Sequence, residues 1–254
     1  MIVIDRETGT ISFDGKTLPI DSDEGFSVLS DAWLDAAIRI KQQYTFTWMG
    51  RPIIQFGDDL VRLQEMVFRV QPDVIVETGV AHGGSLIFFA SLCKVLGRGR
   101  VIGVDVEIRP HNRVAIEAHP LFPLTTLIEG SSIDPATVAA VKQQIQPGET
   151  VLVMLDSNHT AGHVLAELEA YAPLVNVGSY IVAMDGHGME LAARSARGVA
   201  NRWETDNPNA AAREFARTHP EFVLEPTQFM FNESVITEWS TAFRGGVLRR
   251  VSGG

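Results

Sequence analysis

The chain has 254 residues, of which 45% are hydrophobic and 20% charged, enough for one large α/β domain and unlike a disordered chain. Its formal net charge of −10 argues against a nucleic-acid partner, because phosphate binding uses a basic surface. The single cysteine, Cys93, excludes an intramolecular disulfide, and no apolar run is long enough to span a bilayer, so we expect a cytoplasmic protein without a membrane span.

The first fifty residues predict a small extension of the main domain. Residues 1–20 have the pattern of a β-hairpin, and residues 31–44 have the apolar spacing of an amphipathic helix. Residues 44–56 are aromatic-rich and irregular, which suits either a lid over a ligand or a segment wrapped on the core. We therefore expect an extension over residues 1–50 and a cofactor-binding domain over residues 51–254.

From residue 58 onward, helical patterns alternate with short hydrophobic runs. The expected helices cover residues 58–70, 85–96, 112–118, 135–144, 160–172 and 210–217, and the expected strands cover residues 74–78, 100–105, 124–130, 150–156, 180–186, 222–226 and 246–251. Strands rich in Val, Ile and Leu that alternate with helices predict a mostly parallel sheet covered on both faces. The fold class is therefore α/β and Rossmann-like, with seven strands, the last two of which can pair antiparallel.

The block PDVIVETGVAHGGS, residues 72–85, is the most informative part of the chain. It is a buried strand that ends near Glu77 and leads into a turn with Gly79 and Gly83. The next strand ends on Asp105, 21 residues after Gly84, where a carboxylate can accept both ribose hydroxyls. The glycine spacing departs from the dinucleotide fingerprint, and a carboxylate repels phosphate, so S-adenosylmethionine is favoured over NAD. A tight turn without any ligand is the alternative.

A second group of polar residues follows two later strands. Asp156 ends one strand, with His159 three residues further on, and Asp185 ends the next strand. Carboxyl ends of neighbouring strands lie close together, and two carboxylates with water molecules suit Mg²⁺. His159 is the candidate general base, because imidazole titrates near neutral pH. The alternatives are that each aspartate caps the following helix and that His159 binds backbone.

Seven stretches in this order resemble one known family: TFTWMGRPIIQFGDDLVRLQE, PDVIVETGVAHGGS, GVDVEIRPHNR, EGSSIDP, VMLDSNHT, GSYIVAMDG and GGVLRRV. They are similar to the cephalosporin hydroxylase-like class I S-adenosylmethionine-dependent methyltransferases, a family that includes rhamnosyl and other sugar O-methyltransferases. The resemblance covers about residues 44–251. It implies a Rossmann-like sheet with a reversed last strand and cofactor contacts at Glu77, Gly79, Gly83, Ser85, Asp105, Ser131, Ser132 and Asp156.

The resemblance also implies a metal and a base. Asp156 and Asp185 would bind Mg²⁺, Asp156 and His159 would be catalytic, and His159 would take the proton. Relatives often have Glu-Asp at the end of the second strand, where this chain has Met184 and Asp185. The loss of one acid makes metal dependence an open question.

The expected activity is methyl transfer from S-adenosylmethionine to a hydroxyl of a sugar or glycosylated small molecule, and we expect a homo-oligomer. Candidate substrate contacts, chosen from their positions, are Arg109, His111, His187, Phe229 and Phe231. Three alternatives remain from the sequence: a nicotinamide-dependent oxidoreductase on the same fold, a non-catalytic or oxygenase-associated cofactor-binding protein, and a catechol-type O-methyltransferase.

Overall fold

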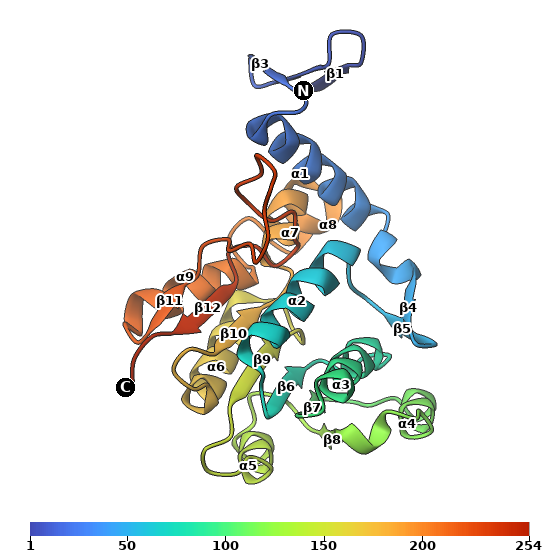
Figure 1. Ribbon diagram of the computed structural model, residues 1–254, viewed down its shortest axis with the longest axis vertical. Helices are drawn as coiled ribbons and strands as arrows, with labels where there is room; N and C mark the ends of the chain where they lie inside the picture. The colour runs from blue at the N-terminus through green and yellow to red at the C-terminus, as the bar shows by residue number, and fades with distance from the viewer. Residues whose placement is uncertain (254) are drawn as a thin grey trace.

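A seven-stranded sheet forms the centre of the computed structural model, which describes residues 1–253 (Figure 1). The strands are β6 (Val74–Thr78), β7 (Arg100–Asp105), β8 (Thr125–Glu129), β9 (Val151–Leu155), β10 (Tyr180–Ala183), β11 (Phe222–Leu224) and β12 (Val247–Arg250). They lie in the order β11-β12-β10-β9-β6-β7-β8. β12 runs antiparallel to both β10 and β11, and the other pairs are parallel. The predicted sheet and its reversed last strand are confirmed.

Helices cover both faces of this sheet. They are α2 (Gly57–Val70), α3 (Gly84–Leu96), α4 (Pro110–Glu117), α5 (Pro135–Gln143), α6 (Ala161–Tyr171) and α9 (Pro208–Thr218), with one-turn helices η2 (Phe122–Leu124) and η3 (Ala172–Leu174). Side chains alternate across each strand, so Ile75 of β6 packs with residues of α2 and α3, whereas Val74 and Val76 pack with residues of α5, α6 and α9. Two apolar cores therefore sandwich the sheet.

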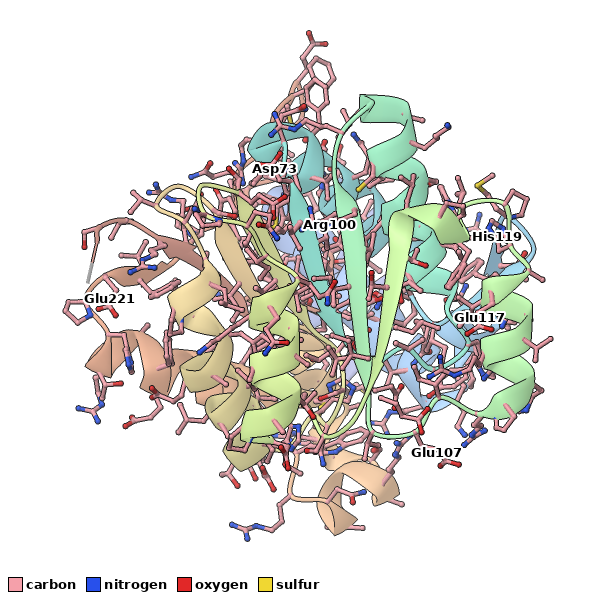
Figure 2. The ribbon with its side chains drawn as sticks, turned by 90° about the horizontal axis from the view of Figure 1, so that it is seen from below. Asp73, Arg100, Glu107, Glu117, His119 and Glu221 are labelled. Atoms are coloured by element: carbon pink, nitrogen blue, oxygen red, sulfur yellow. The ribbon has the colours of Figure 1, made fainter. Side chains whose placement is uncertain are left out.

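The strand order places a crevice at the carboxyl end of β6. The chain moves from β6 outward to β7 and β8 on one side, and β9 and β10 lie on the other, which is the switch point where doubly wound folds bind ligands. In Figure 2, Asp73 and Arg100 mark the amino-terminal ends of β6 and β7, and Glu107 lies at the opposite end, beyond the carboxyl end of β7.

The N-terminal extension differs from the sequence prediction. Residues 1–20 form a three-stranded antiparallel sheet of β1 (Ile2–Asp5), β2 (Thr10–Phe13) and β3 (Lys16–Pro19), and not a simple hairpin. Helix α1 (Asp23–Arg39) begins eight residues earlier than predicted, because the side chain of Ser22 caps it by accepting a hydrogen bond from Gly25 N at 3.1 Å. Figure 1 shows the small sheet beyond one end of α1, away from the central sheet.

Two segments near the crevice have structure that the sequence pattern did not indicate. After η1 (Gln42–Thr45), the aromatic segment expected to be irregular forms a hairpin of β4 (Phe46–Trp48) and β5 (Arg51–Ile53). After β10 come the short helices α7 (Gly186–Leu191), η4 (Ala192–Arg194) and α8 (Ala196–Ala200). α7 and η4 pack against α1, and α8 packs against η4. Among the described residues, no helix has the length and apolar character needed to cross a bilayer.

Candidate active site

The glycine-rich loop after β6 is held against the loop after β9. Gly79 has φ of +93°, and a Cβ at this position would collide with the carbonyl group of Asp156. Gly83, with φ of +79°, ends the loop where α3 begins, and a Cβ there would meet the side chain of Ile116. Only glycine combines these dihedral angles with these close approaches. The predicted turn therefore forms, and it brings Gly79 beside Asp156.

Asp105 supports this loop from the neighbouring strand. Its Oδ2 accepts hydrogen bonds from Val80 N at 2.8 Å and Ala81 N at 3.0 Å, and its Oδ1 accepts one from Glu107 N at 3.1 Å. Asn112 donates a further bond to the carbonyl oxygen of Ala81 at 2.9 Å. Each carboxylate oxygen can accept more than one hydrogen bond, so these contacts leave room for a ligand hydroxyl. The ribose role of Asp105 stays a prediction.

A pocket of about 320 Å³, here called the Asp105 pocket, lies between the loops after β6, β7, β8 and β9. Asp105, Ser131, Ser132, Asp156 and Gly79 all line it, as do Ser157 and His163. Five of the residues predicted to contact the cofactor are thus brought to one cavity. His163 was not predicted from the sequence, because it lies at an unremarkable position in a helical pattern.

Glu77 is a buried acid beneath the same loop. Its side chain is 1% exposed, and its Oε2 has no hydrogen-bond partner among the described residues. Burial raises the pKa of Glu77 to about 8; Ser85 opposes this by a hydrogen bond, and the charge of Asp105 adds to it. At neutral pH the carboxyl group is therefore mostly neutral in the ligand-free protein. A cation placed beside it would favour the ionised form.

A second pocket, of about 200 Å³, continues from the first on the other side of Asp156. This central pocket is lined by Gly79, Ser85, Asp156, His159 and Asp185, together with Tyr44 from η1. The glycine loop and the later acidic residues therefore meet at one cavity, as their positions at strand ends predicted.

Asp156, His159 and Asp185 form a cluster whose ligand atoms all lie within 4.8 Å of one another. His159 Nε2 lies 3.8 Å from Asp156 Oδ1 and 3.6 Å from Asp185 Oδ2, too far for hydrogen bonds. The Nδ1 atom of His159 is buried and has no partner within residues 1–253. Asp185 has φ of +66° and does not cap α7 through its side chain. The capping alternative therefore fails for Asp185.

Two residues that support this cluster were missed by the sequence analysis. Gln55 donates a hydrogen bond from Nε2 to Asp156 Oδ2 at 2.9 Å. Asp59, in the first turn of α2, is fully buried and accepts a hydrogen bond from Ala242 N at 3.1 Å. Burial raises the pKa of Asp156 well above its usual range, and Asp185, Glu77 and Asp59 add to this. Four carboxyl groups thus lie close together in one crevice, and their negative potential favours the binding of a cation.

A third pocket, of about 90 Å³, opens from the central pocket beside His159 and Asp185. This Trp203 pocket is lined by Gln43 and Tyr44 of η1 and by Met189, Arg197 and Trp203 from the region after β10. The Arg197 guanidinium lies 5.2 Å from the centroid of the Trp203 ring. Gln43 Oε1 is buried and has no partner among the described residues. Both segments that were poorly predicted from the sequence therefore build this pocket.

The predicted substrate residues lie elsewhere. None of the five, within the described chain, lines any of the three pockets. Arg109 and His111 are exposed at the start of α4, and Phe231 is also exposed. Phe229 packs under Arg62, whose guanidinium is 4.8 Å from the ring centroid, and His187 contacts Asp31 and Arg244. Their substrate roles stay predictions, and this geometry favours the Trp203 pocket residues instead.

Comparisons with known proteins agree with this arrangement. The model of the Rhamnosyl O-methyltransferase/CmcI family matches residues 40–251. A rhamnosyl O-methyltransferase of Mycobacterium leprae (strain TN) is 31% identical over 150 residues, which cover 56% of this chain and 61% of that protein. The match therefore spans about three fifths of the length of that relative.

Solved structures show the fold. An apo structure of CmcI has a TM-score of 0.54 and 21% identity, with coverage of 83% of this chain and 78% of that one. A CmcI structure described with Mg and SAM has a TM-score of 0.52 and 20% identity, with coverage of 82% and 78%. The chain thus has the Rossmann-like class I methyltransferase fold expected from the sequence.

Proposed function

Because this chain belongs to the Rhamnosyl O-methyltransferase/CmcI family, we propose that it transfers a methyl group from S-adenosylmethionine to a hydroxyl group of a sugar or glycosylated small molecule. The observation that carries the proposal is the continuity of the three pockets. Asp156 lines both the Asp105 pocket and the central pocket, and His159 and Asp185 line both the central pocket and the Trp203 pocket. A donor and an acceptor can therefore meet at the acidic cluster.

The Asp105 pocket and the central pocket suit the cofactor. The adenosine part would lie beside Asp105, Ser131 and Ser132, and the amino-acid part would pass the glycine loop toward Glu77 and Ser85. S-adenosylmethionine supplies a methyl group on a positively charged sulfur, and crowded carboxyl groups favour this charge in a crevice of low polarity. The CmcI structure described with Mg and SAM supports this assignment through the shared family.

The acidic cluster fits Mg²⁺. Asp156 and Asp185 offer carboxylate oxygens on one side of a pocket that can also admit water, which are the ligands this ion uses. The bond from Gln55 to Oδ2 of Asp156 leaves Oδ1 facing the cluster. A bound Mg²⁺ would lower the pKa of an acceptor hydroxyl. With Met184 in place of a second acid, the pair Asp156 and Asp185 would be the protein's carboxylate ligands.

His159 is placed to take the proton from the acceptor. Its Nε2 faces the space between Asp156 and Asp185, and its side chain lines both the central pocket and the Trp203 pocket. The chain itself holds donor and acceptor in one line of cavities, and such alignment supplies a large part of the rate in a displacement reaction. His159 would then act as general base, a contribution of about 10²- to 10⁴-fold.

The lining of the Trp203 pocket favours a sugar over a catechol. Gln43 offers an acceptor that has no partner among residues 1–253, and Arg197 offers donors beside the Trp203 ring. A ligand with several hydroxyl groups can satisfy these polar atoms, whereas a flat aromatic ligand leaves most of them without partners. The name of the Mycobacterium leprae relative points to the same substrate class.

A methyl-transfer assay tests the proposal. Labelled S-adenosylmethionine is offered with nucleotide sugars, oligosaccharides and catechols, with and without Mg²⁺. We expect transfer to a saccharide hydroxyl, and a fall of at least about 100-fold in kcat for His159→Ala with unchanged affinity for S-adenosylhomocysteine, because the base acts only in the chemical step. His219→Ala, which lies by Glu169 on α6, is the matched control.

Three outcomes would contradict the proposal. Cofactor binding without transfer to any hydroxyl would support a non-catalytic or oxygenase-associated protein. Binding of NADH in place of S-adenosylhomocysteine would support an oxidoreductase, and normal turnover of His159→Ala would remove the base assignment. The division at residue 50, the cytoplasmic location and the homo-oligomer stay predictions.

A further inference from the structure

His163 belongs to a polar network at the far side of the Asp105 pocket from Asp105 itself. Its Nε2 lies 3.1 Å from Ser132 Oγ and 3.3 Å from Ser157 Oγ. It also lies 3.5 Å from Oε1 of Glu167, whose side chain is 0% exposed. His163, Ser132 and Ser157 all line the pocket, and Glu167 lies behind them on the next turn of α6.

The hydrogen bonds of Ser157 favour one tautomer of His163. Ser157 donates its single hydroxyl hydrogen to Glu167 Oε1 at 2.7 Å. Towards His163 its oxygen can therefore only accept, and the nearby carboxylate oxygen is also an acceptor. With the hydrogen on Nε2, these acceptors are satisfied and a lone pair remains on Nδ1. Within residues 1–253, Nδ1 makes no hydrogen bond and is not sealed from solvent.

Ser132 can act as a hydrogen-bond donor beside the acceptor of His163. When the single Nε2 hydrogen of His163 is shared between the oxygens of Ser157 and Ser132, the hydroxyl hydrogen of Ser132 is free to point elsewhere. His163 and Ser132 both line the pocket, so Nδ1 as acceptor and the Ser132 hydroxyl as donor are the polar groups that these residues can offer to a ligand there. The edge of adenine has the opposite pattern, with an amino group that donates and an adjacent ring nitrogen that accepts. Hypoxanthine, with a 6-oxo group and a protonated ring nitrogen, reverses that pattern.

We propose that His163, held by Ser157 and Glu167, reads the amino group of the cofactor's adenine and makes this site specific for adenosine over its 6-oxo counterpart. The inference rests on the proposed binding of S-adenosylmethionine in the Asp105 pocket. His163 and Ser132 are the contacting residues, and Ser157 and Glu167 are positioning residues that act through the imidazole.

Calorimetric titration tests the inference without any catalytic turnover. The probes are S-adenosylhomocysteine and its 6-oxo analogue, S-inosylhomocysteine. For the unmodified protein we expect a preference for the adenosine compound of at least about thirtyfold, because two buried polar groups would lose their partners with the analogue. His163→Leu should bring the ratio of the two dissociation constants to within about threefold of one, since the acceptor is removed.

Two further variants make the result interpretable. Ser157→Ala keeps the imidazole but removes the contact that favours one of its tautomers. We therefore expect the ratio of the two dissociation constants to fall while both ligands still bind. His219→Leu removes a histidine that contacts Glu169 and not the pocket, so the ratio should stay at the unmodified value. If His163→Leu binds neither ligand, Ser157→Ala decides the question.

The possible failures are distinguishable. Equal binding of the two ligands by the unmodified protein would overturn the inference and leave the proposed function standing. An undiminished ratio in His163→Leu or in Ser157→Ala would do the same. No binding of S-adenosylhomocysteine at all would overturn both.

Discussion

Replacing Glu77 with glutamine should stabilise the ligand-free protein, and the gain should depend on pH. Burial raises the pKa of Glu77 to about 8, whereas the unfolded chain has the ordinary value of 4.5. Between these values the unfolded state loses its proton first, so stability falls as pH rises from about 4.5 to about 8. From these two pKa values, the carboxyl group costs about 1 kcal/mol at pH 5 and about 4 kcal/mol at pH 8. Glutamine has no charge to lose.

Urea denaturation at several pH values, with a chelator present, measures this effect. The stability difference between Glu77→Gln and the unmodified protein should grow by about 3 kcal/mol from pH 5 to pH 8. Glu149→Gln is the matched control with the opposite sign. Its hydrogen bonds with Arg100 lower the pKa of Glu149 to about 2, so its contribution is fully present above 4.5 and stays constant over this window. A difference for Glu77→Gln that does not change with pH would refute the reasoning.

Three other changes test the geometry of the crevice. Gly79→Ala should lower the free energy of unfolding by more than about 3 kcal/mol in urea denaturation, because the added Cβ collides with the Asp156 carbonyl and φ is unfavourable. Gly97→Ala is the control. Its φ is +69° but the space around it is open, so it should cost only about 1 kcal/mol. Asp105→Ala removes the acceptor of two loop amides, so titration should show at least about tenfold weaker binding of S-adenosylhomocysteine. Unchanged affinity would contradict the role of Asp105 in holding the glycine-rich loop. Tyr44→Ala should raise KM for the acceptor in steady-state kinetics, because Tyr44 lines the Trp203 pocket. Its stability should stay within about 0.5 kcal/mol of the unmodified protein, because the side chain is largely exposed.

The sheet could be predicted from the sequence because its strands are nearly continuous apolar runs. Val74 to Thr78 and Val151 to Leu155 are buried on both faces, and such strands alternate with helices in only a few architectures. The acids at the ends of these strands were placed by the same logic, since parallel strands end at one edge. The association of Glu77, Asp105, Asp156 and Asp185 with the crevice thus followed from topology.

The less predictable parts depend on tertiary contacts. The first turns of α1 carry Phe26, Val28 and Leu29, but none of these side chains is buried, and the predicted pattern began only near Trp33. Ser22 followed by two acidic residues was the available signal. Helix α7 has six residues, two of them glycine, and Gly188 packs against Ile38 and Ala242 from distant parts of the chain. No local pattern encodes such a contact.

Gln55 and His163 were missed for a related reason. Gln55 lies in the loop between β5 and α2, and His163 lies on α6, so each reaches the crevice only through the tertiary fold. Polar residues at unremarkable loop or helical positions are usually solvated, so their burial against other polar groups gives no signal in a single sequence. The Trp203 pocket is likewise assembled from η1 and from the segment after β10, which are far apart in the chain.

The left-handed backbone at Asp185 limits how this site can evolve. Among ordinary residues, only glycine, asparagine and aspartate adopt φ of +66° without much strain. Asparagine or glycine at this position would therefore remove the carboxylate and keep the turn, whereas alanine would remove the carboxylate and strain the turn as well. The backbone and the side chain of Asp185 can thus be tested separately by substitution.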